Sequence, residues 1–149
     1  MASQAELDQA YIDMAYRWSK LSKANRKQVG CIVVKDGVII SDGYNGTPSG
    51  FDNDCEFAPR NHLDMELITK PEVLHAESNA ITKLAKSTQS SEGATMYITI
   101  APCIECSKLI IQSAIARVVI GDLYKNNEGI NLLKKAGIPC WNQNTKQQL

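Results

Sequence analysis

The sequence predicts a single mixed α/β domain, and two patterns in the order of its expected elements support this. Residues 29–34 and 38–41 are expected to be paired strands, because two apolar, β-branched runs flank Asp36 and Gly37, a dipeptide typical of tight turns. Beyond residue 75, expected strands alternate with expected helices, which favours parallel strands there. The 149 residues suffice for one domain with its own core, and no repeat or boundary divides them.

The chain opens with an expected helix over residues 3–21, where Ser3 and Glu6 fit a capping box. Apolar residues at three- and four-residue spacing are predicted to form its buried face: Leu7, Tyr11, Met14, Trp18 and Leu21. After the hairpin, residues 51–74 show little periodicity, and prolines interrupt them. A long irregular stretch of this kind predicts a lid or a contact between subunits.

The alternation of expected helices and strands lies in the second half of the chain. The spacing predicts helices over 75–87, 103–113 and 126–136, and strands over 94–100, 116–121 and 138–141. Pro102 near the start of one helix and Gly137 after another are typical of helix boundaries. The polar residues 142–149 are expected to form a loose tail.

Composition and charge exclude several classes of function. Lys+Arg and Asp+Glu both count 16, so the net charge is zero, which argues against a nucleic-acid polymer as partner. A local basic pocket for one phosphate stays possible. No apolar run could span a membrane, and the first residues lack the apolar core of a signal peptide. We therefore expect a cytoplasmic protein, where paired cysteines bind metal more often than they form disulfides.

Two short segments carry the chemistry of the chain. His75 and Glu77 are two residues apart, and Cys103 and Cys106 follow Pro102 with the spacing of one helical turn. One imidazole and two thiolates suit Zn²⁺ and leave a fourth position open for water. Glu77 would then be free to move protons at that water as the catalytic residue.

Other interpretations of these residues remain open. A Cys-x-x-Cys pair alone is also typical of a redox dithiol or of half a structural zinc site. A structural site would need a fourth protein ligand and has no use for Glu77. A second site built from Cys31, Cys55 and His62 is a weaker alternative, because buried free cysteines are common.

Four segments of this chain resemble the deoxycytidylate (dCMP) deaminase branch of the cytidine deaminase superfamily, of phage or bacterial type. They are residues 26–30, 43–50, 75–81 and 102–106. The His-x-Glu and Pro-Cys-x-x-Cys pair is typical of zinc deaminases in general, whereas the Gly-Tyr-Asn-Gly-Thr-Pro run indicates the dCMP branch. The resemblance implies a three-layer cytidine-deaminase-like fold, with a mixed five-stranded sheet and helices on both faces. It also implies hydrolysis of dCMP to dUMP and ammonia, which feeds dTMP synthesis.

The resemblance further suggests which residues bind the substrate. Asn45 would contact the 3′-hydroxyl, the Ala76 N–H the pyrimidine carbonyl, and Tyr124 the base or sugar. Arg26 is the choice for the 5′-phosphate, because a guanidinium can bind two phosphate oxygens, and Lys27 is the competing choice. Simpler interpretations are a turn residue for Asn45, a surface charge for Arg26 and an ordinary half-buried aromatic for Tyr124.

Relatives of this kind imply regulation and assembly. Many are hexamers that dCTP activates and dTTP inhibits. Carried over to this chain, the resemblance implicates Tyr44, Gly46 and Asn79 in a regulator site, with Mg²⁺ on the nucleotide triphosphate.

Two kinds of alternative function remain open. Another enzyme of the superfamily would act on cytidine, tRNA adenosine, guanine or a pterin-like base. A noncatalytic, zinc-stabilised protein that senses nucleotides is the alternative outside enzymes.

Overall fold

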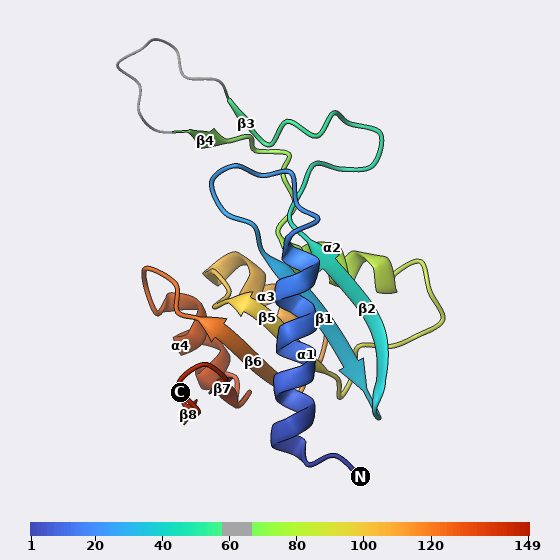
Figure 1. The fold of residues 1–149 in the computed structure, drawn as a ribbon, viewed down its shortest axis with the longest axis vertical. Helices are drawn as coiled ribbons and strands as arrows, with labels where there is room; N and C mark the ends of the chain where they lie inside the picture. The colour runs from blue at the N-terminus through green and yellow to red at the C-terminus, as the bar shows by residue number, and fades with distance from the viewer. Residues whose placement is uncertain (58–66) are drawn as a thin grey trace.

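A six-stranded mixed sheet forms the middle layer of a three-layer arrangement (Figure 1). The computed structural model describes residues 1–57 and 67–149. The strand order is β2-β1-β5-β6-β7-β8. The bounds are Gly30–Lys35 for β1, Val38–Tyr44 for β2, Thr95–Ile100 for β5, Arg117–Asp122 for β6, Cys140–Asn142 for β7 and Gln147–Gln148 for β8.

Helices cover both faces of this sheet, as predicted. Helix α1 (Gln4–Ser19) packs alone on one face, against β1 and β5. On the other face lie α2 (Ala76–Leu84), α3 (Ile104–Gln112) and α4 (Glu128–Lys135) (Figure 1). The prediction of a mixed α/β domain with helices on both faces of its sheet is therefore confirmed.

The strand pairing follows the turn chemistry and the alternation. Asp36 and Gly37 take positive φ values of 51° and 74°, so the antiparallel β1–β2 hairpin closes with a two-residue turn. Strand β5 pairs parallel with β6, and β6 pairs parallel with β7. Both connections cross over through helices α3 and α4, as the alternation predicts.

The C-terminal residues differ from expectation. Strand β8 pairs antiparallel with β7, and the backbone N–H of Leu149 donates to the carbonyl of Cys140 at 2.9 Å. The sheet thus has one strand more than the five expected, and the expectation of a loose tail is wrong. Backbone pairing holds this polar edge strand, together with a hydrogen bond from Gln148 Nε2 to the Cys140 carbonyl at 3.0 Å and packing of Leu149 against the core.

The buried face of α1 also differs from the predicted one. The helix buries Asp8, Ile12, Ala15 and Ser19, whereas Met14 and Leu21 are exposed. Small residues face the sheet because the helix approaches it closely at Gly30, where an added Cβ would overlap the carbonyl oxygen of Ala15. The buried face of the helix is thus shifted by one residue from the predicted one. Leu7, Tyr11 and Trp18, which were predicted to be buried, are half-buried.

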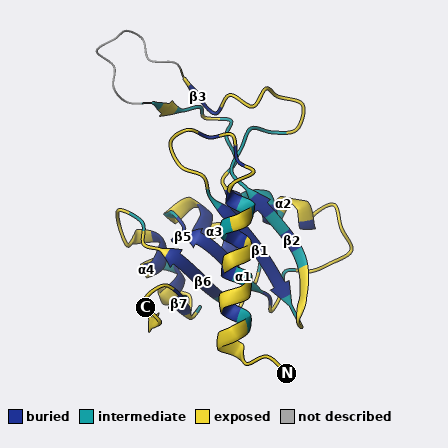
Figure 2. Ribbon diagram, in the orientation of Figure 1, coloured by how far each residue is buried: buried dark blue, intermediate teal, exposed yellow. Residues whose placement is uncertain are grey.

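Two cores fill the space on the two faces of the sheet. The central strands between them are buried (Figure 2). The larger one lies under α2, α3 and α4 and includes Met96, Ile110 and Leu133. The smaller one lies under α1 and includes Ile12 and Tyr97. In the described part of the chain, none of the helices has the length and apolar character needed to cross a membrane.

A small second sheet projects from one end of the molecule. Strands β3 (Glu56–Phe57) and β4 (Ile68–Thr69) pair antiparallel within the stretch expected to be irregular. The projecting segment is largely exposed (Figure 2). His62, named for a second metal site, lies outside the described residues.

Candidate active site

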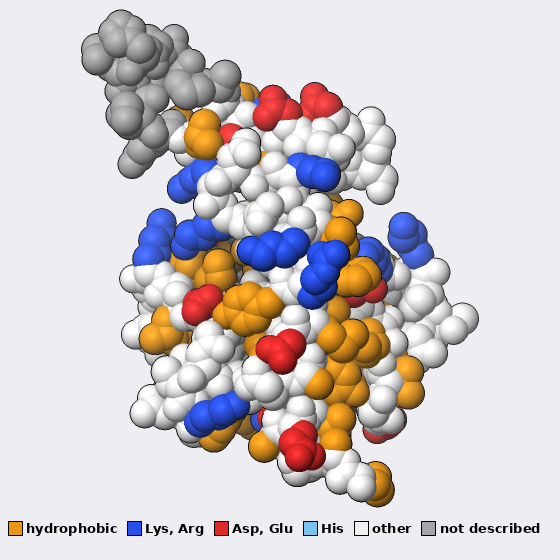
Figure 3. Space-filling view, viewed as in Figure 1, with side chains coloured by type: hydrophobic (Ala, Val, Ile, Leu, Met, Phe, Trp, Pro, Cys, Tyr) orange, Lys and Arg blue, Asp and Glu red, His pale blue; other side chains and the backbone are white. Residues whose placement is uncertain are grey.

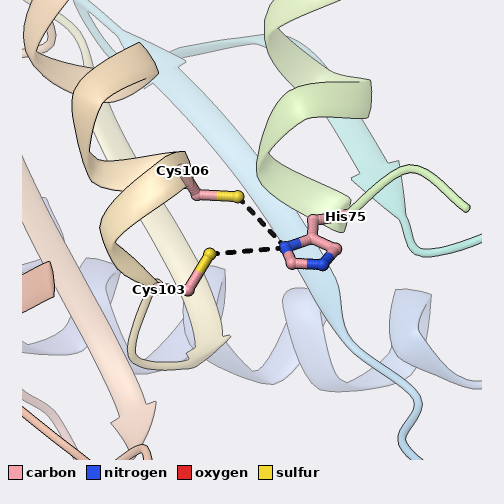
Figure 4. A group of neighbouring side chains, drawn as sticks. All are labelled: His75, Cys103 and Cys106. Carbon is pink, nitrogen blue, oxygen red and sulfur yellow. Dashed lines mark hydrogen bonds between the residues drawn. The ribbon is translucent and has the colours of Figure 1, made fainter. Parts of the chain in front are cut away.

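The starts of α2 and α3 bring three metal-ligand side chains together. His75 is the N-cap of α2 and Cys103 the N-cap of α3, and Cys106 lies in the first turn of α3. His75 Nδ1 lies 3.2 Å from the Sγ of Cys106 and 3.6 Å from the Sγ of Cys103 (Figure 4). Each cap residue has extended backbone geometry, so its side chain projects from the helix end toward the other two.

The geometry of this trio fits one zinc ion. The three ligand atoms lie within 4.8 Å of one another. In a tetrahedral zinc site with ordinary bond lengths, ligand atoms are roughly 3.5–3.8 Å apart, close to the separations found here. The fold therefore brings the predicted ligand set together, with imidazole Nδ1 as the nitrogen that faces both sulfur atoms.

The electrostatics of the trio favour negative charge on one of its two sulfur atoms. Hydrogen bonds with Cys106 and His75 lower the pKa of Cys103 to about 3. The hydrogen bond with Cys103, followed by burial, raises the pKa of Cys106. The pKa of His75 is raised chiefly by its hydrogen bond with Cys103. Of the two thiols, Cys103 thus ionises readily while Cys106 holds its proton, and a cation between them would favour ionisation of both.

Glu77 stands one residue into α2 and is almost fully buried, with 4% of its surface exposed. Burial raises the pKa of its carboxyl group, an effect that the nearby His75 partly offsets. A carboxylate with a raised pKa is a stronger base than one in water, which is what proton transfer near neutral pH requires.

One cavity of about 630 Å³ connects the trio to the rest of the candidate site. The trio contributes His75 and Cys103 to the lining, together with Glu77. At its other end the projecting β3–β4 segment forms a wall. Lys and Arg side chains gather where this segment meets the sheet (Figure 3), and the lining includes Arg26, Lys27 and Lys125. A neutral chain thus has a locally basic cavity, as a phosphate ligand requires.

Arg26 and Asn45 both line the cavity, as their expected roles demand. The Arg26 guanidinium donates to the hydroxyl of Thr69 at 3.1 Å, which holds it beside β4. The Asn45 side chain is already committed: Oδ1 accepts from the Val29 N–H at 2.8 Å and Nδ2 donates to the Lys27 carbonyl at 2.7 Å. Asn45 therefore ties two segments of the backbone together, at a position that lines the cavity.

Ala76 and Tyr124 also line the cavity. The N–H of Ala76 belongs to the first turn of α2, where backbone donors have no partner within the helix. Tyr124 is half-buried, and the ammonium groups of Lys27 and Lys125 lie 5.5 and 5.6 Å from its ring centroid. The aromatic ring thus orders two cations at the cavity.

Of the residues expected at a regulator site, Tyr44 and Gly46 flank Asn45, which lines the cavity. Asn79 Nδ2 donates to the carbonyl of Tyr44 at 2.9 Å, and Gly46 forms a two-way backbone bridge with Leu74. Tyr44, Gly46 and Asn79 are absent from the cavity lining in the part of the chain that the structure describes.

Sequence reasoning missed Glu56, Thr69 and Lys125, which all line the cavity. Glu56 and Thr69 lie in the irregular segment, where no periodicity marks them. Lys125 follows Tyr124 directly, so its place beside a predicted binding residue was the one available signal.

Comparisons with known proteins agree with this site. A family model described as the cytidine and deoxycytidylate deaminase zinc-binding region matches residues 5–122. The deoxycytidylate deaminase of Enterobacteria phage T4 is 35% identical over 88% of this chain and 86% of its own. That of Mus musculus is 37% identical over 89% of this chain and 77% of its own.

A solved structure is similar as well. The crystal structure of dCMP deaminase from the cyanophage S-TIM5, in complex with dCMP and dUMP, is 39% identical and superposes with a TM-score of 0.86. The match covers 95% of this chain and 99% of that one. This chain therefore belongs to the cytidine and deoxycytidylate deaminase family of zinc-binding enzymes.

Proposed function

We propose that this protein hydrolyses dCMP to dUMP and ammonia, with zinc as cofactor and dUMP passing on to dTMP synthesis. The observation that carries the proposal is the single cavity that joins the metal-ligand trio and Glu77 to a group of cations. A nucleotide has a base to be deaminated at one end and a phosphate to be bound at the other. The relatives named deoxycytidylate deaminase, from phage to mouse, support the same substrate.

His75, Cys103 and Cys106 would hold the zinc ion. When bound, zinc supplies an acidified water at neutral pH. Glu77 takes a proton from the water that attacks C4 of the cytosine and transfers it to N3. It then takes the second proton from the new C4 hydroxyl and delivers it to the amino group. The C–N bond breaks, ammonia leaves and the C4 carbonyl of dUMP remains.

The rest of the cavity would orient the nucleotide. The Ala76 N–H donates to the pyrimidine carbonyl, at the positive end of α2. Arg26 binds the 5′-phosphate with Lys27 beside it, because guanidinium and phosphate form paired, charge-assisted hydrogen bonds. Tyr124 packs against the base or sugar. Asn45 contacts the sugar 3′-hydroxyl through the acceptor capacity that its backbone bonds leave unused.

Ultraviolet-monitored deamination by the zinc-loaded protein tests the proposal, with dCMP, cytidine and dCTP as parallel substrates. We expect loss of the cytosine absorbance with dCMP at a kcat/KM at least about tenfold above that with cytidine, because cytidine lacks the phosphate and its charge-assisted contacts. Faster turnover of cytidine would indicate a nucleoside enzyme. Bound zinc without turnover of any of the three would support the noncatalytic alternative.

We also propose that a hexamer of this chain is activated by dCTP and inhibited by dTTP, each bound with Mg²⁺ at Tyr44, Gly46 and Asn79. The hydrogen bond from Asn79 to the Tyr44 carbonyl links α2, which carries Glu77, to this candidate site. A nucleotide that moved Tyr44 would thus reach the catalytic helix. Turnover of dCMP with Mg-dCTP or Mg-dTTP added, and the mass of the assembly, test both points. Binding of labelled dTTP with no effect on turnover would refute the switch.

A further inference from the structure

Three side chains from distant parts of the chain meet at the end of β6. Asp122 is the last residue of this strand. Its Oδ2 accepts a hydrogen bond from the hydroxyl of Tyr16 in α1 at 2.8 Å, and its Oδ1 accepts one from Nδ2 of Asn144 at 3.2 Å. Asn144 Nδ2 also donates to the Tyr16 hydroxyl oxygen at 3.1 Å. Each of the three side chains thus contacts the other two, and we call them the Asp122 cluster.

The partners of Asp122 are themselves held in place. The Tyr16 hydroxyl lies against Gly121, where an added Cβ would overlap its oxygen atom. Asn144 belongs to the turn between β7 and β8, and its backbone N–H donates to Oδ1 of Asn142 at 3.0 Å. The end of β6 is therefore fixed by α1 from one side and by the C-terminal turn from the other.

Asp122 stands directly before a segment that lines the cavity. Residues 123–127 lie between β6 and α4 and belong to neither a strand nor a helix. Within this segment Tyr124 and Lys125 line the cavity. Tyr124 is half-buried, whereas Leu123 and Lys125 on either side of it are exposed. Because so little of the segment is packed, its course depends on where β6 ends.

The backbone of Asp122 also reaches the segment that leads to the metal trio. Ile100 is opposite Asp122 in the parallel β5–β6 pair, and the Asp122 carbonyl accepts from the Ala101 N–H at 2.8 Å. Ala101 lines the cavity two residues before Cys103. No member of the Asp122 cluster lines the cavity that the described residues form, so the cluster can act on a ligand only through these two segments.

We infer that Asp122 is a positioning residue: the Asp122 cluster fixes the end of β6 so that Tyr124 and Lys125 face the bound nucleotide. This inference rests on the proposed function. Without the cluster, residues 123–127 populate other positions, and the affinity falls by the fraction of molecules in which the segment is in place. Binding is affected more than the chemical step, because Glu77 and the metal trio belong to α2 and α3.

Binding of dUMP, the product of the proposed reaction, tests the inference without turnover. Calorimetry measures its Kd for the zinc-loaded wild-type protein, for Asp122→Ala and Tyr16→Phe, and for the double variant. Asp8→Asn is the matched control. Asp8 also ties α1 to β6, but through Arg117, the first residue of the strand. It therefore reports what a loosened α1 does when the far end of β6 is intact.

We expect Asp122→Ala and Tyr16→Phe each to weaken dUMP binding by about three- to tenfold, the worth of one ordinary hydrogen bond. The double variant should bind within about twofold of the weaker single variant, because the two residues act through one contact. In steady-state kinetics with dCMP, KM should rise by the same factor while kcat stays within about twofold of the wild-type value.

Stability and affinity should separate in the control. Asp8→Asn should lower the melting temperature and leave the Kd of dUMP at the wild-type value. Asp122→Asn keeps an acceptor oxygen for Tyr16 and should bind dUMP within about twofold of the wild-type protein. An unchanged Kd in Asp122→Ala, or an equal rise in Asp8→Asn, overturns the inference and leaves the cluster a purely structural role. If the wild-type protein neither binds dUMP nor deaminates dCMP, the proposed function is wrong and the inference falls with it.

Discussion

The carboxylate of Asp8 and the guanidinium of Arg117 form a two-bond ion pair, although 109 residues separate them. The two N···O distances are 2.9 and 2.7 Å, and the Asp8 side chain is only 4% exposed. The hydroxyl of Tyr97 donates to the same carboxylate at 2.6 Å. Helix α1 is thus tied to β5 and β6 on the face of the sheet opposite α2 and α3.

Replacing Asp8 with Asn should destabilise the fold by about 2–4 kcal/mol, because the half-buried Arg117 loses its counterion while the burial remains. Urea unfolding of the variant and the wild-type protein measures this difference. Asp13→Asn is the matched control on the same helix. Asp13 is exposed and also accepts from a Gln four residues earlier, at 2.9 Å. Equal stability losses in the two variants would contradict the importance of the ion pair.

The same ion pair predicts how stability depends on pH. Burial alone would raise the pKa of Asp8, but hydrogen bonds from Arg117, Tyr97 and Gln4 outweigh it and hold the pKa below its ordinary value of 3.8. The unfolded state therefore binds the proton more readily. The contribution of Asp8 is fully present above its unfolded pKa and is lost as pH falls through 3.8 toward the folded value. Urea unfolding at a series of pH values should show the wild-type and Asp8→Asn curves converging below about pH 4.

The parts of the site that the sequence predicted are those whose residues lie close together in the chain. His75, Glu77, Cys103 and Cys106 could be recognised because each pair is local and begins a helix. Their meeting required that the two helices lie on the same face of the mixed sheet with their first turns close together.

The remaining contacts depend on residues that meet only in the folded chain. Asp8 is a residue type that normally faces solvent, and its partners Tyr97 and Arg117 lie in two distant strands. The sequence pattern therefore predicted a buried face of α1 that is one residue away from the observed face. Glu56 and Arg26 are 30 residues apart. Their contact depends on strands β3 and β4, whose two-residue pairing carries no periodic signal. The wall of the cavity was therefore not predictable.

Loss of one zinc ligand should release the metal and loosen the ends of two helices. We expect Cys106→Ser to reduce bound zinc from one per chain to near zero and to lower the melting temperature, because Cys106 and His75 join α3 to α2. Elemental analysis and thermal unfolding measure the two effects. Cys140→Ser is the control: it changes a buried thiol in β7 and should keep its zinc even where packing suffers. Full zinc occupancy in Cys106→Ser would remove this residue from the ligand set.

Glu77→Gln should separate metal binding from catalysis. The amide has nearly the same shape but cannot take a proton, so we expect kcat for dCMP to fall by about 10²–10⁴-fold while zinc content is unchanged. Steady-state kinetics on samples of known zinc content measure the change. The exposed Glu105, in the first turn of α3, gives the matched control, since Glu105→Gln should leave kcat within about twofold. Substantial activity in Glu77→Gln would mean that another group moves the protons.

Gly43 should matter for activity although it does not line the cavity. A Cβ at this position in β2 would overlap the carbonyl oxygen of Ala76 and lie 2.8 Å from the backbone nitrogen of Ala80. Gly43→Ala therefore pushes the first turns of α2 away from the sheet and moves His75 and Glu77 with them. Because catalytic geometry tolerates little displacement, we expect kcat to fall by about tenfold or more, together with a loss of stability.

Two measurements make that prediction specific. Zinc content and kcat of Gly43→Ala are compared with those of Gly30→Ala, where the added Cβ would overlap the Ala15 carbonyl oxygen under α1. Both substitutions overpack a helix against the sheet, so both should lower stability by about 1–3 kcal/mol. Only Gly43→Ala displaces the helix that carries Glu77. If the two variants lose kcat equally, the damage comes from general destabilisation, and the tight approach of α2 to β2 has no special part in positioning Glu77.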